Sequence, residues 1–441
     1  MVSETATDTW PPKVSGAQKR APWARSLWAL DWLNFLMADV QNGLGPYLAV
    51  FLKGARHWGA GNIGIAMAVS NIAGVACQIP AGMLVDGLRI KRLLVATAAL
   101  ISAGACLGIA TRPELAWVVG AQIAIGAAAA VMPPALAALC LGLVGHCRMP
   151  AQLSRNQAFS HAGAFSAAVL IGAGGRFWGY DWIFYLLCAF AAGMMAAVFS
   201  IRAADIDHQL ARGGSTAEKG AAPPIRLREL LKYRNLLIFL GAVLLFHFGN
   251  AAMLPMAGQV LARTHPGSAT SALSACIIVA QLVMMGIALA VGRALQAGCG
   301  RKPIFLFMLA VLSVRGVLFA LLTTNPWAVV AIQALDGVAA GIFSVISVII
   351  ASDLMQGTGR FNLAQGLMNV AVGAGAGVSN LTAGFVVQWF GYPIGFFYLS
   401  GVAICGLVFG ATFMPETRPA ESLGGKSERG QSNTTPDAVV P

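Results

Sequence analysis

Twelve long apolar stretches, separated by short charged or Gly/Pro-rich turns, limit what this 441-residue chain can fold into more than any other feature. Hydrophobic residues make up 57% of the chain and charged residues only 10%, whereas soluble domains carry about 25% charged residues. Such an excess of apolar side chains needs lipid around it, and each stretch can cross a bilayer as a helix. The sequence therefore predicts an all-α integral membrane protein with twelve transmembrane helices.

The predicted helices fall six and six around a polar interruption at 202–235, which we interpret as a linker containing a short amphipathic helix. The segment 1–26 before the first helix and the tail 415–441 are polar. The two predicted six-helix bundles, 27–201 and 236–414, contain helices at 27–52, 61–84, 92–111, 115–142, 155–175, 181–201, 236–261, 270–292, 303–324, 327–352, 364–390 and 394–414.

Two basic turns, 210 residues apart, indicate that the bundles are duplicates. In the first, Gly82 is followed by Asp86 and by the basic pair Lys91-Arg92. In the second, Gly292 is followed at the same spacing by Gln296 and by Arg301-Lys302. Matches at nearly constant offset continue to the last segment, where Phe177-Trp-Gly-Tyr180 corresponds to Trp389-Phe-Gly-Tyr392. Duplicated helical halves are the usual build of a secondary transporter.

With twelve helices in two halves and a basic turn after the second helix, residues 25–415 resemble the major facilitator superfamily. The family's turn reads G-x-L-x-D-x-x-G-R-[RK]-[RK]; this chain keeps Gly82, Asp86, Lys91 and Arg92 but has Arg89 where glycine is usual. The resemblance implies that such turns brace one gating state. Gating candidates are Gly82, Asp86, Lys91, Arg92, Arg301, Lys302 and Arg360. Because Gln296 replaces the aspartate, we expect a complete charged latch only in the amino-terminal half.

The net charge of +12 does not indicate nucleic-acid binding, because the positions of the Lys and Arg residues instead set the orientation of the chain in the membrane. If both termini lie in the cytoplasm, Arg315 falls within a helix and 23 of the other 28 Lys and Arg residues face the cytoplasm, as the positive-inside rule requires. We expect a multi-pass protein of a bacterial inner membrane, monomeric and in contact with the lipid bilayer. The basic residues on the outer side are Lys53, Arg56, Arg112, Arg176 and Arg263.

Polar residues recur at helical spacing inside several apolar segments, although lipid-facing helices do not carry such stripes. A stripe of this kind faces either a water-filled cavity or a partner helix. The resemblance implies that helices 1, 4, 7 and 10 line the cavity, where most of these residues lie. Candidates for the substrate cavity are Asp31, Asn34, Gln41, Asn42, Gln122, His247, Asn250, Gln333 and Ser344.

Ionisable residues at bilayer depth are costly and need a function or a partner. Arg315 and Asp336 lie in consecutive antiparallel helices at similar depth, so they are candidates for an intramembrane ion pair. Asp39 has no evident cation in its half, and burial without a cation favours a protonated carboxyl. The proton-coupling candidates are therefore Asp39, Asp336 and His161, with the alternative that Asp336 only pairs with Arg315.

These features favour a secondary active transporter of a small hydrophilic or amphipathic solute, coupled to protons, with export favoured over import. A proton-coupled importer or a facilitator is the alternative. Gln122 stands where proton-driven drug exporters of the family carry arginine, which disfavours a standard multidrug exporter. An intramembrane lipid-modifying enzyme would need clustered catalytic groups, and neither H-E-x-x-H nor paired carboxylates occur. No metal or cofactor is predicted.

Overall fold

The computed structural model describes residues 24–41, 44–208, 232–356 and 361–418, and all the regular secondary structure in these ranges is helical. The first half contains α1 (Ala24–Gln41), α2 (Gly45–Gly54), α3 (Ala60–Gly87), α4 (Lys91–Thr111), α5 (Leu115–Trp178), α6 (Trp182–Ser200) and the 3-10 turn η1 (Ala203–Asp205). The second half contains α8 (Arg234–Asn250), α9 (Met253–Thr264), α10 (Ala269–Gln296), α11 (Arg301–Leu322), α12 (Pro326–Leu354), α13 (Phe361–Phe390) and α14 (Tyr392–Phe413). The predicted amphipathic helix in the linker lies largely outside the described residues.

Eleven described segments are long and apolar enough to cross a membrane. They match the predicted helices from 61–84 onwards. The first predicted helix, 27–52, corresponds to α1 and α2, which flank residues outside the described ranges. The all-α membrane architecture predicted from the sequence is thus confirmed.

Two of the predicted boundaries differ from the structure. The fourth and fifth membrane helices, Leu115–Gly145 and Ala151–Trp178, extend into the expected loop and meet through a kink at Gly145. Gly145 has φ +70°, a conformation that glycine adopts without steric cost. The seventh helix, predicted as continuous over 236–261, is instead divided into α8 and α9 at Ala251 and Ala252.

Small residues set the distance between neighbouring helices. A Cβ added to Gly337 would lie 2.6 Å from the Ala280 carbonyl oxygen, and one added to Gly341 would lie 2.8 Å from that of Met284. This Gly-x-x-x-Gly face of α12 therefore packs directly on the backbone of α10. Without a hydrophobic driving force between helices in lipid, such close approach is the main source of packing energy.

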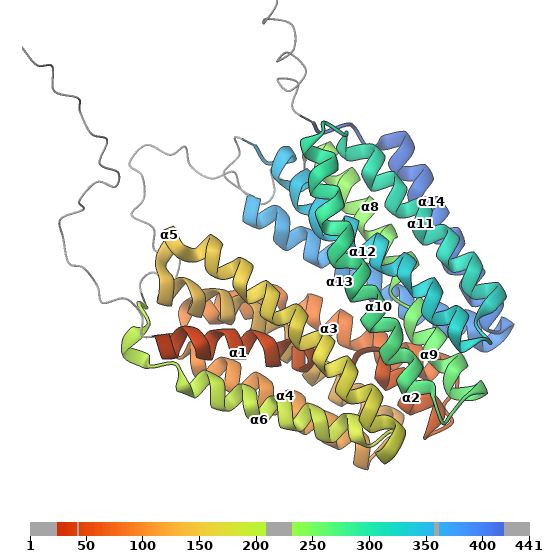
Figure 1. The fold of residues 1–441 in the computed structure, drawn as a ribbon, viewed down its shortest axis with the longest axis horizontal. Helices are drawn as coiled ribbons and strands as arrows, with labels where there is room; N and C mark the ends of the chain where they lie inside the picture. Colours follow the sequence, from red (N-terminus) through yellow and green to blue (C-terminus); the bar gives the residue numbers. More distant parts are fainter. Residues whose placement is uncertain (1–23, 42–43, 209–231, 357–360, 419–441) are drawn as a thin grey trace, which may run out of the picture.

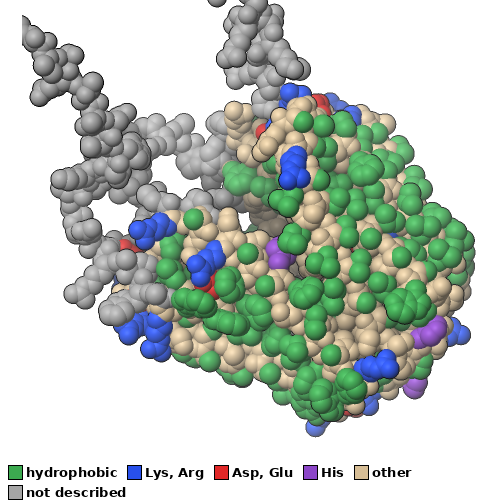
Figure 2. All heavy atoms as spheres, in the orientation of Figure 1, with side chains coloured by type: hydrophobic (Ala, Val, Ile, Leu, Met, Phe, Trp, Pro, Cys, Tyr) green, Lys and Arg blue, Asp and Glu red, His purple; other side chains and the backbone are tan. Residues whose placement is uncertain are grey.

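The two halves meet at one end of the molecule and diverge at the other (Figure 1). We call the end that carries α2 and α9 the closed end, and the end where the described chain begins at Ala24 the open end. Figure 2 shows the surface hollowed between the halves on the open side. The described hydrogen bonds between the halves all lie towards the closed end. They are Tyr47 with Ser274 at 2.8 Å, Gly61 N with Gln388 Oε1 at 3.0 Å, Ser271 Oγ with Gly172 O at 2.9 Å and Tyr180 OH with Pro266 O at 3.1 Å.

Candidate translocation site

The first membrane segment of each half departs from regular helix at an equivalent position. Gly45, at the start of α2, has φ +46°, and α8 and α9 are separated at Ala251 and Ala252, about 210 residues later. Ser379 Oγ accepts a hydrogen bond from Ala252 N at 3.1 Å, which satisfies one backbone donor at the second break. Interrupted membrane helices at matching positions mark the substrate site of many transporters, because the freed backbone groups can face a solute.

A charged network lies beside the second break. Arg315 of α11 forms an ion pair with Asp336 of α12 at 2.7 Å. The same guanidinium donates to Asn250 Oδ1, at the end of α8, and to Gln333 Oε1 at 3.1 Å. Gln333 Nε2 donates in turn to Asp336 Oδ2 at 2.7 Å. Three helices of the second half are therefore held together by one buried guanidinium.

The two charged members of this network differ in burial, and their burial limits the function that the network can have. The Arg315 side chain is 1% exposed, whereas that of Asp336 is 18% exposed. The Arg315 guanidinium also lies 5.2 Å from the Phe319 ring centroid, but its Nε has no hydrogen-bond partner among the described residues. Removing one member of such a pair leaves an uncompensated buried charge. The network is suited to bracing the helices around the break.

His247 lies in α8, one turn before Asn250, and aromatic rings pack against it. Its ring lies 4.8 Å from the Phe343 ring in an edge arrangement and 5.0 Å from Phe246. Nδ1 lies 3.2 Å from the Val243 carbonyl oxygen, as a donor to that acceptor when Nδ1 carries a proton. His247 is partly exposed, so its free ring edge remains available beside the network.

In the first half, Asp31 is part of a polar cluster between α1 and α5. Its carboxylate pairs with Arg155 Nη2 at 2.7 Å and accepts a hydrogen bond from Gln152 Nε2 at 3.0 Å. Gln152 also donates to Asn156 Oδ1 at 2.9 Å. Asp31 is fully buried, and Asn34 is 5% exposed and donates to the Leu30 carbonyl. Asp31 therefore faces a partner helix, and Asn34 is buried against its own helix; neither faces an open cavity.

His161 and Gln157 instead point into the space between the halves. They lie 3.2 Å apart, and both are exposed. Gly172, on the same helix, packs against Ser274 of α10. His161 precedes Gly172 by eleven residues, or three helical turns, so it lies on the same face. Because α5 and α10 diverge towards the open end, this face of α5 lines the hollow there.

Gln281 of α10 is a candidate that the sequence interpretation missed. It follows Ser274 by seven residues, which places it on the same face of α10. Its Oε1 atom is buried without a hydrogen-bond partner among the described residues. Its apolar neighbours in the sequence hid it, although the spacing from Ser274 would have indicated it.

The other predicted cavity residues are distributed as follows. Gln122 is 6% exposed within the first half, and Ser344 donates to the Gly341 carbonyl of its own helix. Asn42 and Arg360, together with the side chains of Asp39, Gln41 and Asp86, lie outside the described residues.

The basic turns contact their own halves. Arg92 donates to the Ile201 carbonyl at 2.7 Å, beyond the end of α6, and Lys302 donates to the Ala411 carbonyl of α14 at 2.8 Å. Lys91 Nζ donates to Val85 O at 2.7 Å within its turn. A Cβ at Gly82 would meet no atom within 4 Å, so close packing does not require glycine there.

The basic pair of the second turn has acidic partners, although Gln296 stands where the first turn has an aspartate. Arg301 forms an ion pair with Asp353 of α12 at 3.1 Å. Glu416, beyond α14, accepts hydrogen bonds from the backbone N–H groups of Arg301 at 2.8 Å and Lys302 at 3.1 Å. These acids come from distant segments and not from position 296, so a comparison of the two turns alone could not find them.

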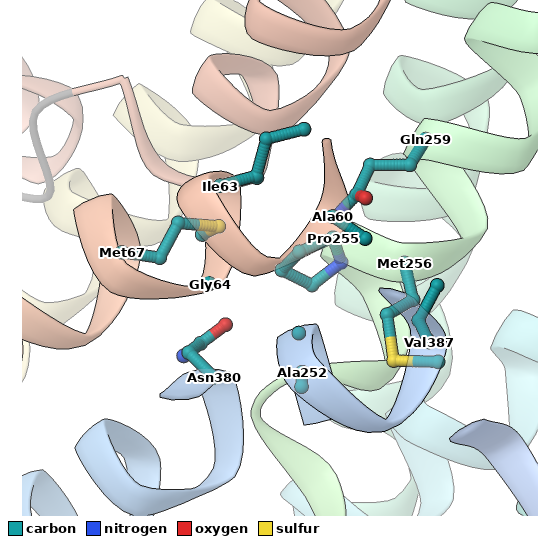
Figure 3. Close-up of a pocket in the computed structure, with 11 residues that line it drawn as sticks. Ala60, Ile63, Gly64, Met67, Ala252, Pro255, Met256, Gln259, Asn380 and Val387 are labelled. Carbon is teal, nitrogen blue, oxygen red and sulfur yellow. The ribbon is translucent and has the colours of Figure 1, made fainter. Parts of the chain in front are cut away.

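A small pocket marks the junction of the halves at the closed end (Figure 3). Ile63, Gly64 and Met67 of α3 face Met256 of α9 and Asn380 of α13 across it. Its volume of about 10 Å³ holds roughly one water molecule. The halves are therefore closely packed at this junction in this conformation.

Comparison with known proteins assigns the family. A sequence model described as "Major Facilitator Superfamily" matches residues 30–297 and 285–439. The chain belongs to the major facilitator superfamily. It is 41% identical over 406 residues to uncharacterized MFS-type transporters from two strains of Mycobacterium tuberculosis, CDC 1551 / Oshkosh and ATCC 25618 / H37Rv. The match covers 90% of this chain and 97% of each relative.

Solved transporters share the fold of this family member at low sequence identity. The nucleoside transporter NupG superposes with a TM-score of 0.72 at 14% identity, covering 88% of this chain and 98% of that one. The peptide transporter POT gives a TM-score of 0.68 at 14% identity, covering 88% and 94%. The protein is thus a multi-pass membrane transporter of a small solute, as its family is, and not an enzyme.

Proposed function

We propose that this transporter works by alternating access and carries a small hydrophilic or amphipathic solute in exchange for protons. The observation that carries the proposal is the pairing of a closely packed closed end with a hollow at the open end, around two membrane segments that depart from regular helix. A transporter that alternates needs contacts between its halves that form at one end at a time. In this conformation all the described hydrogen bonds between the halves lie towards the closed end, as the requirement predicts for one of the two alternating states.

The open end corresponds to the cytoplasmic side in this proposal. The basic turns and both described chain ends lie there, and the positive-inside rule places such residues in the cytoplasm. The described conformation is then inward-facing, in a bacterial inner membrane. Export is favoured because no sugar-porter pattern occurs in the linker or in the sixth helix; import or facilitated diffusion is the alternative.

Proton coupling is assigned to Asp39, with His161 as the second candidate. Asp336 was the other candidate, but its ion pair with Arg315 at 2.7 Å supports a bracing role for it. The polar groups that support a hydrophilic solute are Gln157 and His161 on α5, Gln281 on α10, and His247 with Asn250 beside the break. These side chains supply hydrogen-bond donors and acceptors, and none of them carries a permanent charge.

Transport into proteoliposomes tests the proposal. A thermal-shift screen of candidate solutes first identifies a ligand, and the labelled ligand is then offered to proteoliposomes with an imposed pH gradient. Accumulation that follows the gradient and disappears when protons equilibrate is expected. Movement of the solute at the same rate with and without the gradient would reject proton coupling, and turnover of a lipid without solute movement would reject transport.

A further inference from the structure

The membrane-facing surface of the first half carries an apolar groove between α4 and the first part of α5. Its volume is about 410 Å³. Gly104, Ala105 and Gly108 form its wall on α4, and Gly120 and Ala121 form much of its wall on α5. Neither helix wall belongs to the hollow between the halves, so the groove has no part in the proposed solute path. Small residues leave it open where a larger side chain would fill it.

A basic residue lies at the end of this groove. The α4 wall includes positions 101, 104, 105 and 108, and Arg112, the residue that caps α4 at the closed end, donates its backbone N–H to the Gly108 carbonyl oxygen at 2.9 Å. The Arg112 guanidinium lies 5.6 Å from the ring centroid of Trp117, which lines the groove from α5. Trp117 is 48% exposed. Tryptophan is enriched at the level of lipid headgroups, so the mouth of the groove lies at the membrane interface.

The charge at the mouth is available to a ligand. No carboxylate lies within 4 Å of the Arg112 guanidinium in the described part of the chain, although Glu114 is exposed nearby on the loop before α5. The Trp117 indole N–H also has no acceptor among the described residues. This apolar slot, with a guanidinium and an indole N–H at its mouth, is complementary to a phospholipid. The acyl chain matches the slot, and the phosphate matches the two donors at the mouth.

We propose that this groove binds an anionic phospholipid of the leaflet at the closed end, with one acyl chain in the slot and the phosphate on Arg112. A second copy of this chain is the competing occupant, because small-residue faces also associate helices. A two-fold dimer across the groove would bring the two Arg112 side chains to the same depth, and their like charges oppose it. The cationic mouth therefore favours lipid.

Native mass spectrometry of the full-length protein tests the site with two probes, phosphatidylglycerol and phosphatidylcholine of identical acyl chains. Arg112→Gln is expected to weaken retention of phosphatidylglycerol about fivefold, as loss of one interfacial cation should, and Arg112→Lys to restore most of it. Glu114→Gln should strengthen retention, because it removes the opposing charge. Gly104→Leu and Gly120→Leu should reduce retention of both lipids, since added side chains enter open space at both positions.

Matched variants separate the groove from general effects. Arg176→Gln removes an exposed cation at the same end, and Gly401→Leu adds a side chain at another open position on α14. Both should retain lipid like the wild type. Equal retention by Arg112→Gln and the wild type, or equal losses in the two controls, would overturn the proposal. Conversion of a dimer into monomers by Gly120→Leu would assign the groove to a second copy instead.

Discussion

Arg92 and Lys302 occupy the same position in the two halves and make the same bond. Each donates to a backbone carbonyl 109 residues further along the chain, Ile201 for Arg92 and Ala411 for Lys302. In both halves the turn after the second membrane helix is thereby tied to the end of the sixth. In the described conformation, these two bonds hold each half together as a unit and do not join one half to the other.

This equivalence predicts equal effects of mutation in the two halves. Arg92→Ala and Lys302→Ala should each cost about 1 kcal/mol, because a charged donor to a partly exposed carbonyl is lost. The melting temperature of the protein in detergent should fall by about 1 °C in each, because the entropy of unfolding grows with chain length. Arg293→Ala, an exposed residue of the second turn, is the matched control and should leave it unchanged. A loss confined to one half would show that the two bonds are not equivalent.

The ion pair between Arg315 and Asp336 predicts non-additive effects. Arg315→Ala and Asp336→Ala should each destabilise the protein by about 3 kcal/mol or more, because each leaves a buried charge without its partner. The double variant should lose less than the sum of the two, since no charge is then left alone. Thermal unfolding of the four proteins in the same detergent measures this. Additive losses would mean that the pair contributes no coupling energy.

Asp39→Asn tests the assignment of the proton carrier. The variant should lose accumulation driven by a pH gradient, because an amide cannot carry the proton. It should keep exchange of labelled for unlabelled solute, which needs no net proton movement. Asp31→Asn is the comparison, since Asp31 is fixed by Arg155 and Gln152; it should lower stability more than coupling. Gradient-driven accumulation by Asp39→Asn at the wild-type level would remove Asp39 from the mechanism.

Glu416 should make the stability of the second half depend on pH. Partial burial alone would raise its pKa, but backbone N–H donors from Arg301, Arg418, Lys302 and Thr417 outweigh burial and lower the pKa below 4.5. A carboxylate with a lowered folded-state pKa stabilises the protein above the unfolded value and loses that effect as the pH falls through the folded value. The melting-temperature difference between wild type and Glu416→Gln should therefore be constant near neutral pH and shrink below pH 4.5. A difference that is independent of pH throughout would contradict this assignment.

The sequence predicted the membrane helices well because their signal is local. A bilayer requires long apolar runs, and charged turns end them. The break between α8 and α9 was missed because Ala251 and Ala252 are as apolar as the residues around them. Pro255, shortly after the break, and Gly45-Pro46, at the start of α2, were the available signals.

Side-chain partners were predictable only where the chain fixes which helices are neighbours. Arg315 and Asp336 lie on consecutive antiparallel helices, so their depths could be compared directly. Asp31 and Arg155 are 124 residues apart on helices that are not consecutive, and their contact depends on the packing of the whole half. Glu416 reaches the second basic turn from beyond the last helix, which no spacing within the turns could indicate.

The accessibility of Gln281 tests alternating access most directly and requires no knowledge of the solute, because Gln281 lies near the middle of α10, between the two ends. In a variant whose native cysteines are replaced, Gln281→Cys is exposed to a membrane-impermeant maleimide in inside-out and in right-side-out energised vesicles. Arg176→Cys, at the closed end, serves as the control for the outer face. Alternating access predicts labelling of Gln281→Cys from both faces, faster from the cytoplasmic side because the hollow opens there. Labelling from the cytoplasmic face alone, with Arg176→Cys labelled normally from outside, would contradict the account.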